Sequence, residues 1–228
     1  MTLSPTDQGP VFPRTVLVTG GTGYLGRALI PELLRQGHRV RALVRPGSEW
    51  KLPVGVESVM GDPLAAASVA RALDGADTLV HLVGVAKPSP AKARQFRAID
   101  LASIQAAVAA ATGTHPRPHV VYLSVAQPAP VMKAYVAVRR EGEALLRASG
   151  LDATCLRPWY VLGPGHRWPF VLLPVFAVLR WLPATRARAR RLGFVTLTQM
   201  VAALREAVEH PAQGVRVVEV PELARRRS

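Results

Sequence analysis

The fold of this chain is decided near its start by one stretch, Val16-Leu17-Val18-Thr19-Gly20-Gly21-Thr22-Gly23-Tyr24-Leu25-Gly26. An apolar run leads into the glycines and a helical pattern follows them, which indicates a strand, a tight loop and a helix. Glycine permits the tight turn, lets the backbone approach a bound anion, and allows the helix to pack against its strand. The helix N-terminus adds free N–H groups and the positive end of its dipole. The stretch therefore predicts an anion-binding loop.

Two glycine spacings overlap in this loop. Gly21, Gly23 and Gly26 form G-x-G-x-x-G, which is typical of dinucleotide sites when a strand precedes it and a helix follows. Thr19 and Gly20 extend it to T-G-x-x-G-x-x-G. The alternative is a chance glycine-rich turn, but both the strand and the helix that the motif requires are present. We therefore predict that a dinucleotide is bound by Thr19, Gly20, Gly21, Thr22, Gly23, Tyr24, Leu25 and Gly26.

Outward from the loop, short runs of Val and Leu alternate with longer helical patterns. Continuous apolar runs are typical of a parallel sheet covered on both faces. Strands are predicted at Thr15–Thr19, Arg39–Val44, Val56–Met60, Thr78–Val83, His119–Val125, Ala153–Leu156 and Val215–Val220. Helices are predicted at Tyr24–Arg35, Leu64–Leu73, Ala91–Ala111, Met132–Ala148 and Leu197–Glu209. The alternation predicts an α/β fold, a doubly wound parallel sheet of the Rossmann type with a small C-terminal substrate-side portion.

One domain is predicted for residues 14–228, because no repeat or low-complexity linker divides the chain. Residues 1–13 are rich in proline and are expected to form a flexible leader. Residues 159–193 are expected to form a small lobe on the substrate side. The start of the chain lacks the basic and apolar regions of a secretory signal, and we expect a soluble, cytoplasmic protein.

Composition excludes several classes of protein. The 228 residues are 49% hydrophobic, which excludes a wholly disordered chain, and Cys155 is the single cysteine, which excludes a disulfide framework. The histidines lack metal-ligand spacing, so no metal site is predicted. The net charge of +14 is compatible with nucleic acid, a membrane surface or an anionic ligand. No nucleic-acid-binding motif accompanies the charge, so we expect no nucleic-acid partner.

The second predicted strand indicates which dinucleotide is bound. An NAD site places Asp or Glu about 20 residues past the glycines, whereas an arginine suits the 2′-phosphate of NADP. Here the strand ends in Val44-Arg45 without an acid. The planar guanidinium of Arg45 matches phosphate geometry. We predict NADP, with NAD as the alternative if Arg45 is only a solvated surface residue.

Together these motifs resemble the short-chain dehydrogenase/reductase superfamily, particularly its extended and atypical branches. The resemblance covers about residues 15–165. Gly61-Asp62 is similar to the family's Gly-Asp, whose carboxylate meets the adenine, and His81-Leu82-Val83-Gly84 is similar to the segment whose backbone approaches the cofactor. Arg157-Pro158 followed by Gly163-Pro164-Gly165 resembles the segment beside the nicotinamide and substrate. The resemblance implies further cofactor-binding residues at Asp62, Leu82, Val83, Gly84 and Pro158.

The resemblance also implies a catalytic group. Ser124 lies at the carboxyl end of a predicted strand, Tyr135 comes eleven residues later, and Arg139 lies one helical turn further on the same face. In the family, the tyrosine is the general acid/base, the serine orients the substrate oxygen, and a lysine in Y-x-x-x-K assists the tyrosine. Here Arg139 replaces that lysine. Arginine keeps the positive charge and can bond ribose hydroxyls, but it cannot shuttle a proton.

Two functions therefore stay open. In the first, the chain is an NADP-dependent oxidoreductase that transfers hydride between NADP(H) and a small carbonyl or alcohol. In the second, it is a non-catalytic nucleotide-binding sensor or assembly factor, similar to NmrA-like proteins. A third hypothesis is peripheral membrane contact through residues 168–191, where an apolar segment precedes an arginine cluster. A lid, a homo-oligomer surface or a packed helix is favoured over membrane contact for that segment, because exposed apolar patches usually mark interaction sites.

Overall fold

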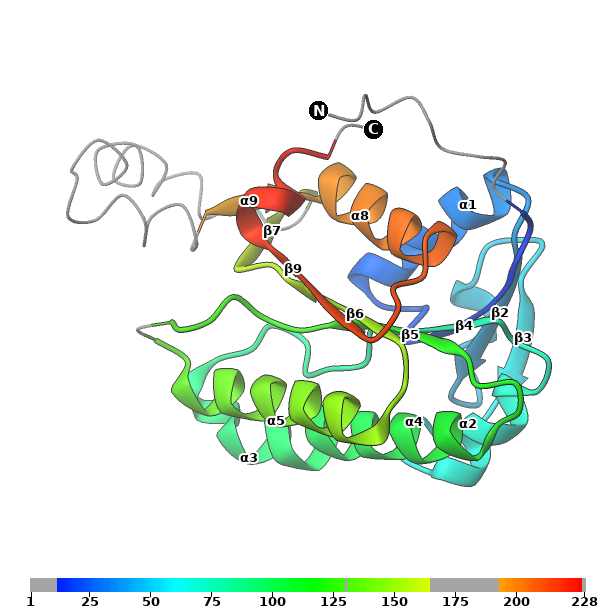
Figure 1. Ribbon diagram of the computed structural model, residues 1–228, viewed down its shortest axis with the longest axis horizontal. Coiled ribbons are helices and arrows are strands. Elements are labelled where there is room, and N and C mark those ends of the chain that lie inside the picture. The colour runs from blue at the N-terminus through cyan, green and yellow to red at the C-terminus, as the bar shows by residue number, and fades with distance from the viewer. Residues whose placement is uncertain (1–11, 130, 165–192, 227–228) are drawn as a thin grey trace.

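A computed structural model describes residues 12–129, 131–164 and 193–226. Its centre is a seven-stranded sheet in the order β3-β2-β1-β4-β5-β6-β9, with every neighbouring pair parallel (Figure 1). The strand order reverses between β1 and β4, so the prediction of a doubly wound parallel sheet is confirmed. The strands are β1 (Thr15–Thr19), β2 (Arg39–Val44), β3 (Glu57–Met60), β4 (Thr78–His81), β5 (His119–Leu123), β6 (Ala153–Arg157) and β9 (Val215–Glu219).

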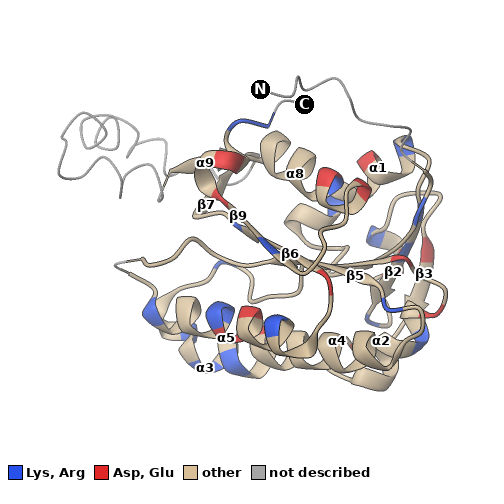
Figure 2. Ribbon diagram, viewed as in Figure 1, with Lys and Arg blue, Asp and Glu red and all other residues tan. Residues whose placement is uncertain are grey.

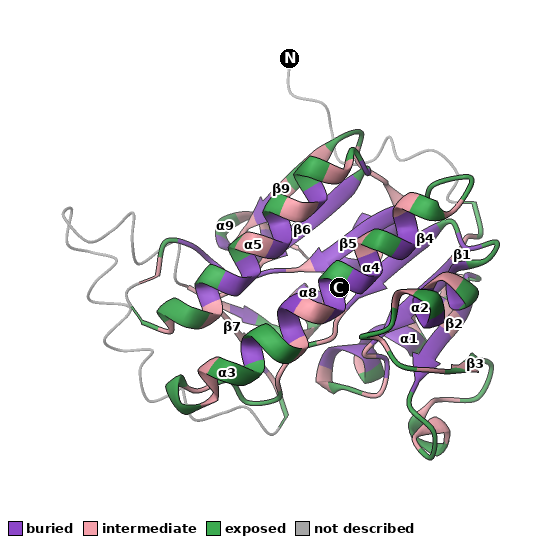
Figure 3. Ribbon diagram, turned by 90° about the horizontal axis from the view of Figure 1, so that it is seen from below, coloured by how far each residue is buried: buried purple, intermediate pink, exposed green. Residues whose placement is uncertain are grey.

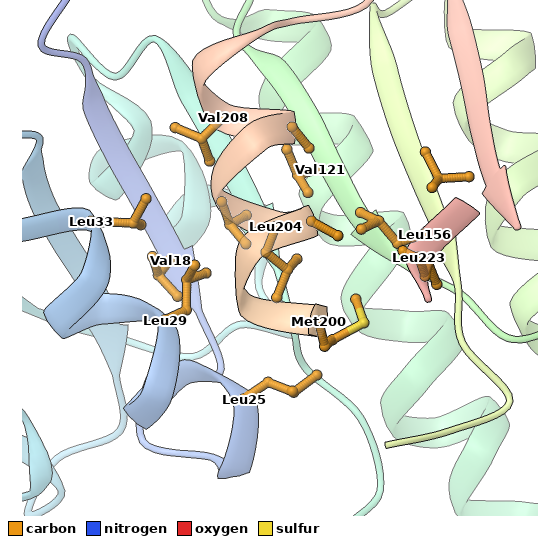
Figure 4. Packing of buried hydrophobic residues seen from close by; sticks show 14 of the residues in the cluster. Val18, Leu25, Leu29, Leu33, Val121, Leu156, Met200, Leu204, Val208 and Leu223 are labelled. Atoms are coloured by element: carbon orange, nitrogen blue, oxygen red, sulfur yellow. The ribbon is translucent and has the colours of Figure 1, made fainter. Parts of the chain in front are cut away.

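Helices cover both faces of this sheet. One face carries α1 (Tyr24–Arg35), α8 (Leu197–Glu209) and the short α9 (Val220–Leu223), and the other carries α2 (Ala66–Leu73), α4 (Ala102–Gly113) and α5 (Lys133–Ser149) (Figure 1). Each layer has its own apolar core, and the central strands β1, β4, β5 and β6 between them are mostly buried (Figure 3). In the first core, Leu29, Leu204 and Met200 pack over the sheet, as Figure 4 shows. Burial on both faces explains why the strands read as unbroken apolar runs.

The segment leading into α4 differs from the single helix predicted at Ala91–Ala111. It is divided into a 3-10 turn (Pro90–Lys92), a short α3 (Ala93–Gln95), a π-helix (Phe96–Leu101) and then α4. The wider π-turn carries Phe96 and Asp100 inward together, and both are buried. The irregular helix is thus tied to the placement of a buried carboxylate.

A second, smaller sheet follows the carboxyl end of β6. In it, β7 (Tyr160–Leu162) pairs in parallel with β8 (Phe194–Thr196), a pairing that the sequence did not predict. Most of the predicted leader (1–13) and of the predicted lobe (159–193), with the segment 168–191, lie outside the described residues. Within the described part of the chain, no helix has the length and apolar character needed to cross a membrane.

Charged residues are found on both helical layers, with Lys and Arg interspersed among Asp and Glu (Figure 2). Many form ion pairs along or between helices, such as Arg35 with Glu32 and Arg226 with Glu206. Exposed pairs of this kind stabilise a fold only slightly. We therefore look for functional basic side chains at the ends of the strands and inside the protein, rather than among these exposed ion pairs.

Candidate functional site

The glycines of the first loop are required by backbone packing. Gly20 has φ of +76°, and a Cβ there would lie 2.8 Å from the carbonyl carbon of Leu82 at the end of β4. A Cβ at Gly26 would lie 2.5 Å from the Cα of Gly21, because α1 begins directly over the loop. The N–H of Gly23 donates to the carbonyl of Gly20 at 3.0 Å and closes the turn. The loop therefore brings bare backbone to the point where the strand order reverses.

Among the described residues, no acidic or capping side chain occupies the N-terminus of α1. Gly23 is its N-cap, no side chain caps it, and its first turn contains no acidic residue. Leu25 points into the apolar core (Figure 4), so only its backbone is available at the loop. This arrangement suits a phosphate group, which would meet free N–H groups and the positive end of the helix dipole.

The ends of β2 and β3 continue the same edge of the sheet. Arg45 begins a turn in which the N–H of Ser48 donates to its carbonyl at 3.1 Å, and Gly47 has φ of +77°. The Arg45 side chain is exposed, and within the described residues it forms no ion pair or hydrogen bond. Asp62 is also exposed, and its carboxylate accepts from the N–H of Leu64 at 2.9 Å. Both predicted adenosine-side residues thus lie beside the loop with charged atoms facing solvent.

Arg139 joins the ends of two strands from inside the protein. Its guanidinium donates to the carbonyl of Leu123 at 2.8 Å and to the carboxylate of Asp100 at 2.6 Å. A third bond of 3.4 Å reaches the carbonyl of Val83. A Cβ at Gly84 would collide with this guanidinium, which explains the glycine at that position. The structure therefore places Arg139 behind the predicted cofactor surface, where it holds the ends of β4 and β5.

Tyr135 and Arg139 are brought together as predicted from their spacing. The guanidinium carbon of Arg139 lies 5.2 Å from the centre of the Tyr135 ring, within range of a cation–π contact. Phe96 also packs against this ring, with 5.1 Å between ring centres. Burial raises the pKa of the Asp100 carboxyl, and the attraction of Arg139 opposes that rise. The result is a fixed positive charge beside a half-buried phenol near the N-terminus of α5.

Ser124 does not contact this pair through its hydroxyl, and its role of orienting a substrate oxygen stays a prediction. Its hydroxyl donates to the carboxylate of Glu143 at 2.5 Å, and Ser124 is 2% exposed. The hydrogen that was expected to orient a substrate oxygen is therefore used inside the protein. The physical reason is that α5 places Glu143 two turns beyond Tyr135, where it reaches back beneath the end of β5.

Sequence reasoning missed Glu143 as the centre of a buried polar network. Its carboxylate also accepts from Gln127 at 2.9 Å and from Arg157 at 2.8 and 2.5 Å. Burial alone would raise the pKa of Glu143, but the hydrogen bonds from Arg157 and Ser124 outweigh it and hold that pKa below its usual value. The signal was present in the sequence, because Tyr135, Arg139 and Glu143 recur at four-residue intervals.

The remaining predicted residues lie along the same edge. Leu82 and Val83 are half-buried after β4, and Pro158 is buried after β6, with its carbonyl accepting from the N–H of Ala126 at 3.0 Å. Thr22 is half-buried, and Tyr24 packs its hydroxyl against Gly163. Gly165 lies outside the described residues. Within the described ranges, no group of three or more His, Cys, Asp or Glu residues could hold a metal ion.

Comparisons with known proteins agree with this geometry. The family model described as NAD(P)H-binding matches residues 20–166. A ceramide reductase of Caulobacter vibrioides is 31% identical over 177 residues, which is 77% of this chain and 55% of that protein. A 3-beta-hydroxysteroid dehydrogenase of Mycolicibacterium neoaurum is 39% identical over 70 residues, covering 31% of this chain and 19% of that protein. The chain thus spans about half the length of the first relative and about a fifth of the second.

Solved structures show the same fold at low identity. The Bordetella bronchiseptica enzyme WbmH, in complex with NAD+, superposes with a TM-score of 0.68 at 20% identity, over 91% of this chain and 76% of that one. A short-chain dehydrogenase/reductase family oxidoreductase from Burkholderia thailandensis gives 0.67 at 22% identity, over 93% and 94%. This chain therefore belongs to the NAD(P)H-binding family, and its fold is of the Rossmann type.

Proposed function

We propose that the protein is an NADP(H)-dependent oxidoreductase that interconverts a carbonyl and an alcohol. The observation that supports this most is the cation of Arg139, fixed 5.2 Å from the ring of Tyr135 at the carboxyl edge of the sheet. Proton transfer by a tyrosine requires that its phenolate be tolerated, and a nearby fixed positive charge provides this. The bond between Arg139 and Asp100 keeps that charge in place.

In this proposal, the cofactor and each side chain have a separate role in the reduction of the carbonyl. The bound cofactor would supply the hydride that is added to the carbonyl carbon. Tyr135 donates its phenolic proton to the carbonyl oxygen, so that the carbonyl gains a hydride and a proton and becomes an alcohol. Arg139 stabilises the phenolate that remains. Ser124 takes no part in this scheme, because its hydroxyl is bonded to Glu143.

NADP(H) is proposed as the cofactor because of the end of β2. Arg45 is exposed there, no carboxylate occupies the position that would bond a ribose 2′-hydroxyl, and the turn Arg45–Ser48 holds the backbone in place. An arginine fork can bond a 2′-phosphate in a bidentate manner.

Lipid-like substrates are proposed because of the relatives' names. Three of them are a ceramide reductase, a 3-beta-hydroxysteroid dehydrogenase and a sterol demethylase protein B. Each name refers to a compound with a large apolar body. We therefore propose a carbonyl or alcohol carried on an apolar substrate.

The test is isotope transfer from NADPH deuterated at the transferred position. The protein would be incubated with a panel of ketosteroids and long-chain keto compounds, and the products would be analysed by mass spectrometry. Deuterium in a product alcohol supports the proposal. Tight NADPH binding without deuterium transfer across the panel would contradict it.

The second candidate is a nucleotide-binding protein without turnover. The bond between Ser124 and Glu143 favours it, because this removes one of the three side chains expected in a catalytic group. Under this alternative, NADPH and NADP+ binding would change the protein's stability or its partners, while no substrate is converted. The isotope experiment separates the two candidates.

A further inference from the structure

A series of buried hydrogen bonds runs behind the cofactor edge from β1 to the π-helix. The Thr19 hydroxyl lies 2.9 Å from Nδ1 of His81, and Nε2 of His81 lies 3.2 Å from the hydroxyl of Ser103. The Ser103 hydroxyl then donates to the carbonyl of Asp100 at 3.0 Å. All four residues are fully buried. We call Thr19, His81, Ser103 and Asp100 the His81 network.

The hydrogen bonds of the His81 network have one consistent direction. Ser103 has a single hydroxyl hydrogen, and it is donated to the carbonyl of Asp100. Its oxygen must therefore accept from Nε2–H of His81, which leaves Nδ1 as the acceptor for the Thr19 hydroxyl. Burial, with the charge of Arg139, lowers the pKa of His81 to about 3, so the ring stays neutral near pH 7. Each donor is thus matched by one acceptor.

Both ends of the His81 network touch the candidate site. Thr19 directly precedes Gly20 of the glycine loop, and its carbonyl accepts from the N–H of Leu82 at 3.0 Å. At the other end, the Asp100 carboxylate binds Arg139 at 2.6 Å and accepts from the N–H of Val85 at 3.1 Å. Arg139 in turn contacts Tyr135. The network therefore links the phosphate end of the site to the tyrosine end.

We propose that His81 is a positioning residue, which fixes the glycine loop relative to the Asp100–Arg139–Tyr135 group. This inference rests on the proposed function. A dinucleotide must be bound at its pyrophosphate and its nicotinamide at the same time. If the protein groups at one end shift relative to those at the other, the contacts with both parts of the cofactor weaken. A satisfied, low-dielectric hydrogen-bond series is stiff, because moving one member leaves a buried polar atom unpaired. The competing interpretation is a core histidine that only stabilises the fold.

The decisive variant is Ser103→Ala, because Ser103 lies on α4 and, among the described residues, its hydroxyl bonds only His81 and the Asp100 carbonyl. Losing its two hydrogen bonds, to His81 and to the Asp100 carbonyl, is expected to weaken NADPH binding about threefold to tenfold, measured by titration calorimetry. Thr112→Val is the matched control, because the Thr112 hydroxyl bonds only carbonyls of α4 itself. It should leave the NADPH dissociation constant unchanged. If Ser103→Ala lowers the stability of the protein but leaves the NADPH dissociation constant at its wild-type value, the inference is overturned.

Two further measurements separate this inference from the proposed function. His81→Leu should weaken NADPH binding, and His81→Gln should recover part of it, because the glutamine side chain offers an acceptor oxygen and a donor NH2 group. Nitrogen-15 NMR of the imidazole should show the proton on Nε2 in the protein without cofactor; a proton on Nδ1 would overturn the inference alone. Failure of the wild-type protein to bind NADPH would overturn both.

Discussion

The guanidinium of Arg139 lies 2.6 Å from a carboxylate oxygen of Asp100, and the two side chains are 3% and 0% exposed. This pair explains how the arginine at this position is kept inside the protein. A buried arginine needs a counter-charge, and the π-helix delivers one. The positive charge of Arg139 is thereby kept next to Tyr135, and the Asp100 carboxylate holds it in the protein interior.

Breaking this pair on one side should be costly. Asp100→Leu leaves the buried Arg139 cation without its counter-charge, and we expect a loss of about 3–5 kcal/mol in the free energy of unfolding. The double variant Asp100→Leu/Arg139→Met should recover much of that loss, because no buried charge remains. Urea denaturation of the single and double variants measures both. A cost below about 1 kcal/mol for Asp100→Leu would show that the pair is not energetically coupled.

Adding a methyl group to the glycine loop should abolish cofactor binding. In Gly26→Ala, the new Cβ would lie 2.5 Å from the Cα of Gly21 and 2.6 Å from the Gly20 carbonyl oxygen, so the backbone of the loop must move. Gly113→Ala is the control, because a Cβ there meets nothing within 4 Å. Calorimetric titration with NADPH should show no binding for Gly26→Ala and wild-type affinity for Gly113→Ala. Equal affinities would exclude this loop as the phosphate site.

Arg45 should set the preference between NADPH and NADH. Removing its charge-assisted bonds to a 2′-phosphate is expected to weaken NADPH binding about tenfold to a hundredfold, while NADH binding stays unchanged. Arg39→Ala is the matched control, because Arg39 is an exposed arginine at the opposite end of the same strand. The ratio of the two dissociation constants is the measurement. A ratio that does not change in Arg45→Ala would contradict the NADP(H) proposal.

Acid should destabilise the protein partly through His119. Burial lowers the pKa of His119 to about 4, whereas an unfolded histidine titrates near ~6.5. The unfolded state therefore binds the proton first, so the stability from the neutral ring is present above about pH 6.5 and is lost toward about pH 4. Between about pH 7 and pH 4.5, His119→Gln should lose about 2 kcal/mol less than wild type in urea denaturation. Identical pH dependence in the two proteins would contradict this assignment.

The sequence predicted those parts of the site that local patterns determine. The glycine loop, its flanking strand and helix, and the contact of Tyr135 with Arg139 follow from spacing along one or two elements. The bond between Ser124 and Glu143 was missed because Glu143 comes from a different element, and the sequence does not show which polar groups meet beneath a sheet edge. The π-helix at Phe96–Leu101 was missed for a similar reason, because its register is set by Asp100 reaching Arg139.

Substitution of Tyr135 tests the central claim most directly. With a carbonyl substrate identified by deuterium transfer, the rate of NADPH consumption would be compared for wild type, Tyr135→Phe and Ser124→Ala. Tyr135→Phe removes only the phenolic oxygen and should lower the rate about 10²-fold to 10⁴-fold, the usual contribution of a general acid. Ser124→Ala should keep the rate within about tenfold, because its hydroxyl is bonded to Glu143. Wild-type turnover by Tyr135→Phe would contradict the proposed mechanism.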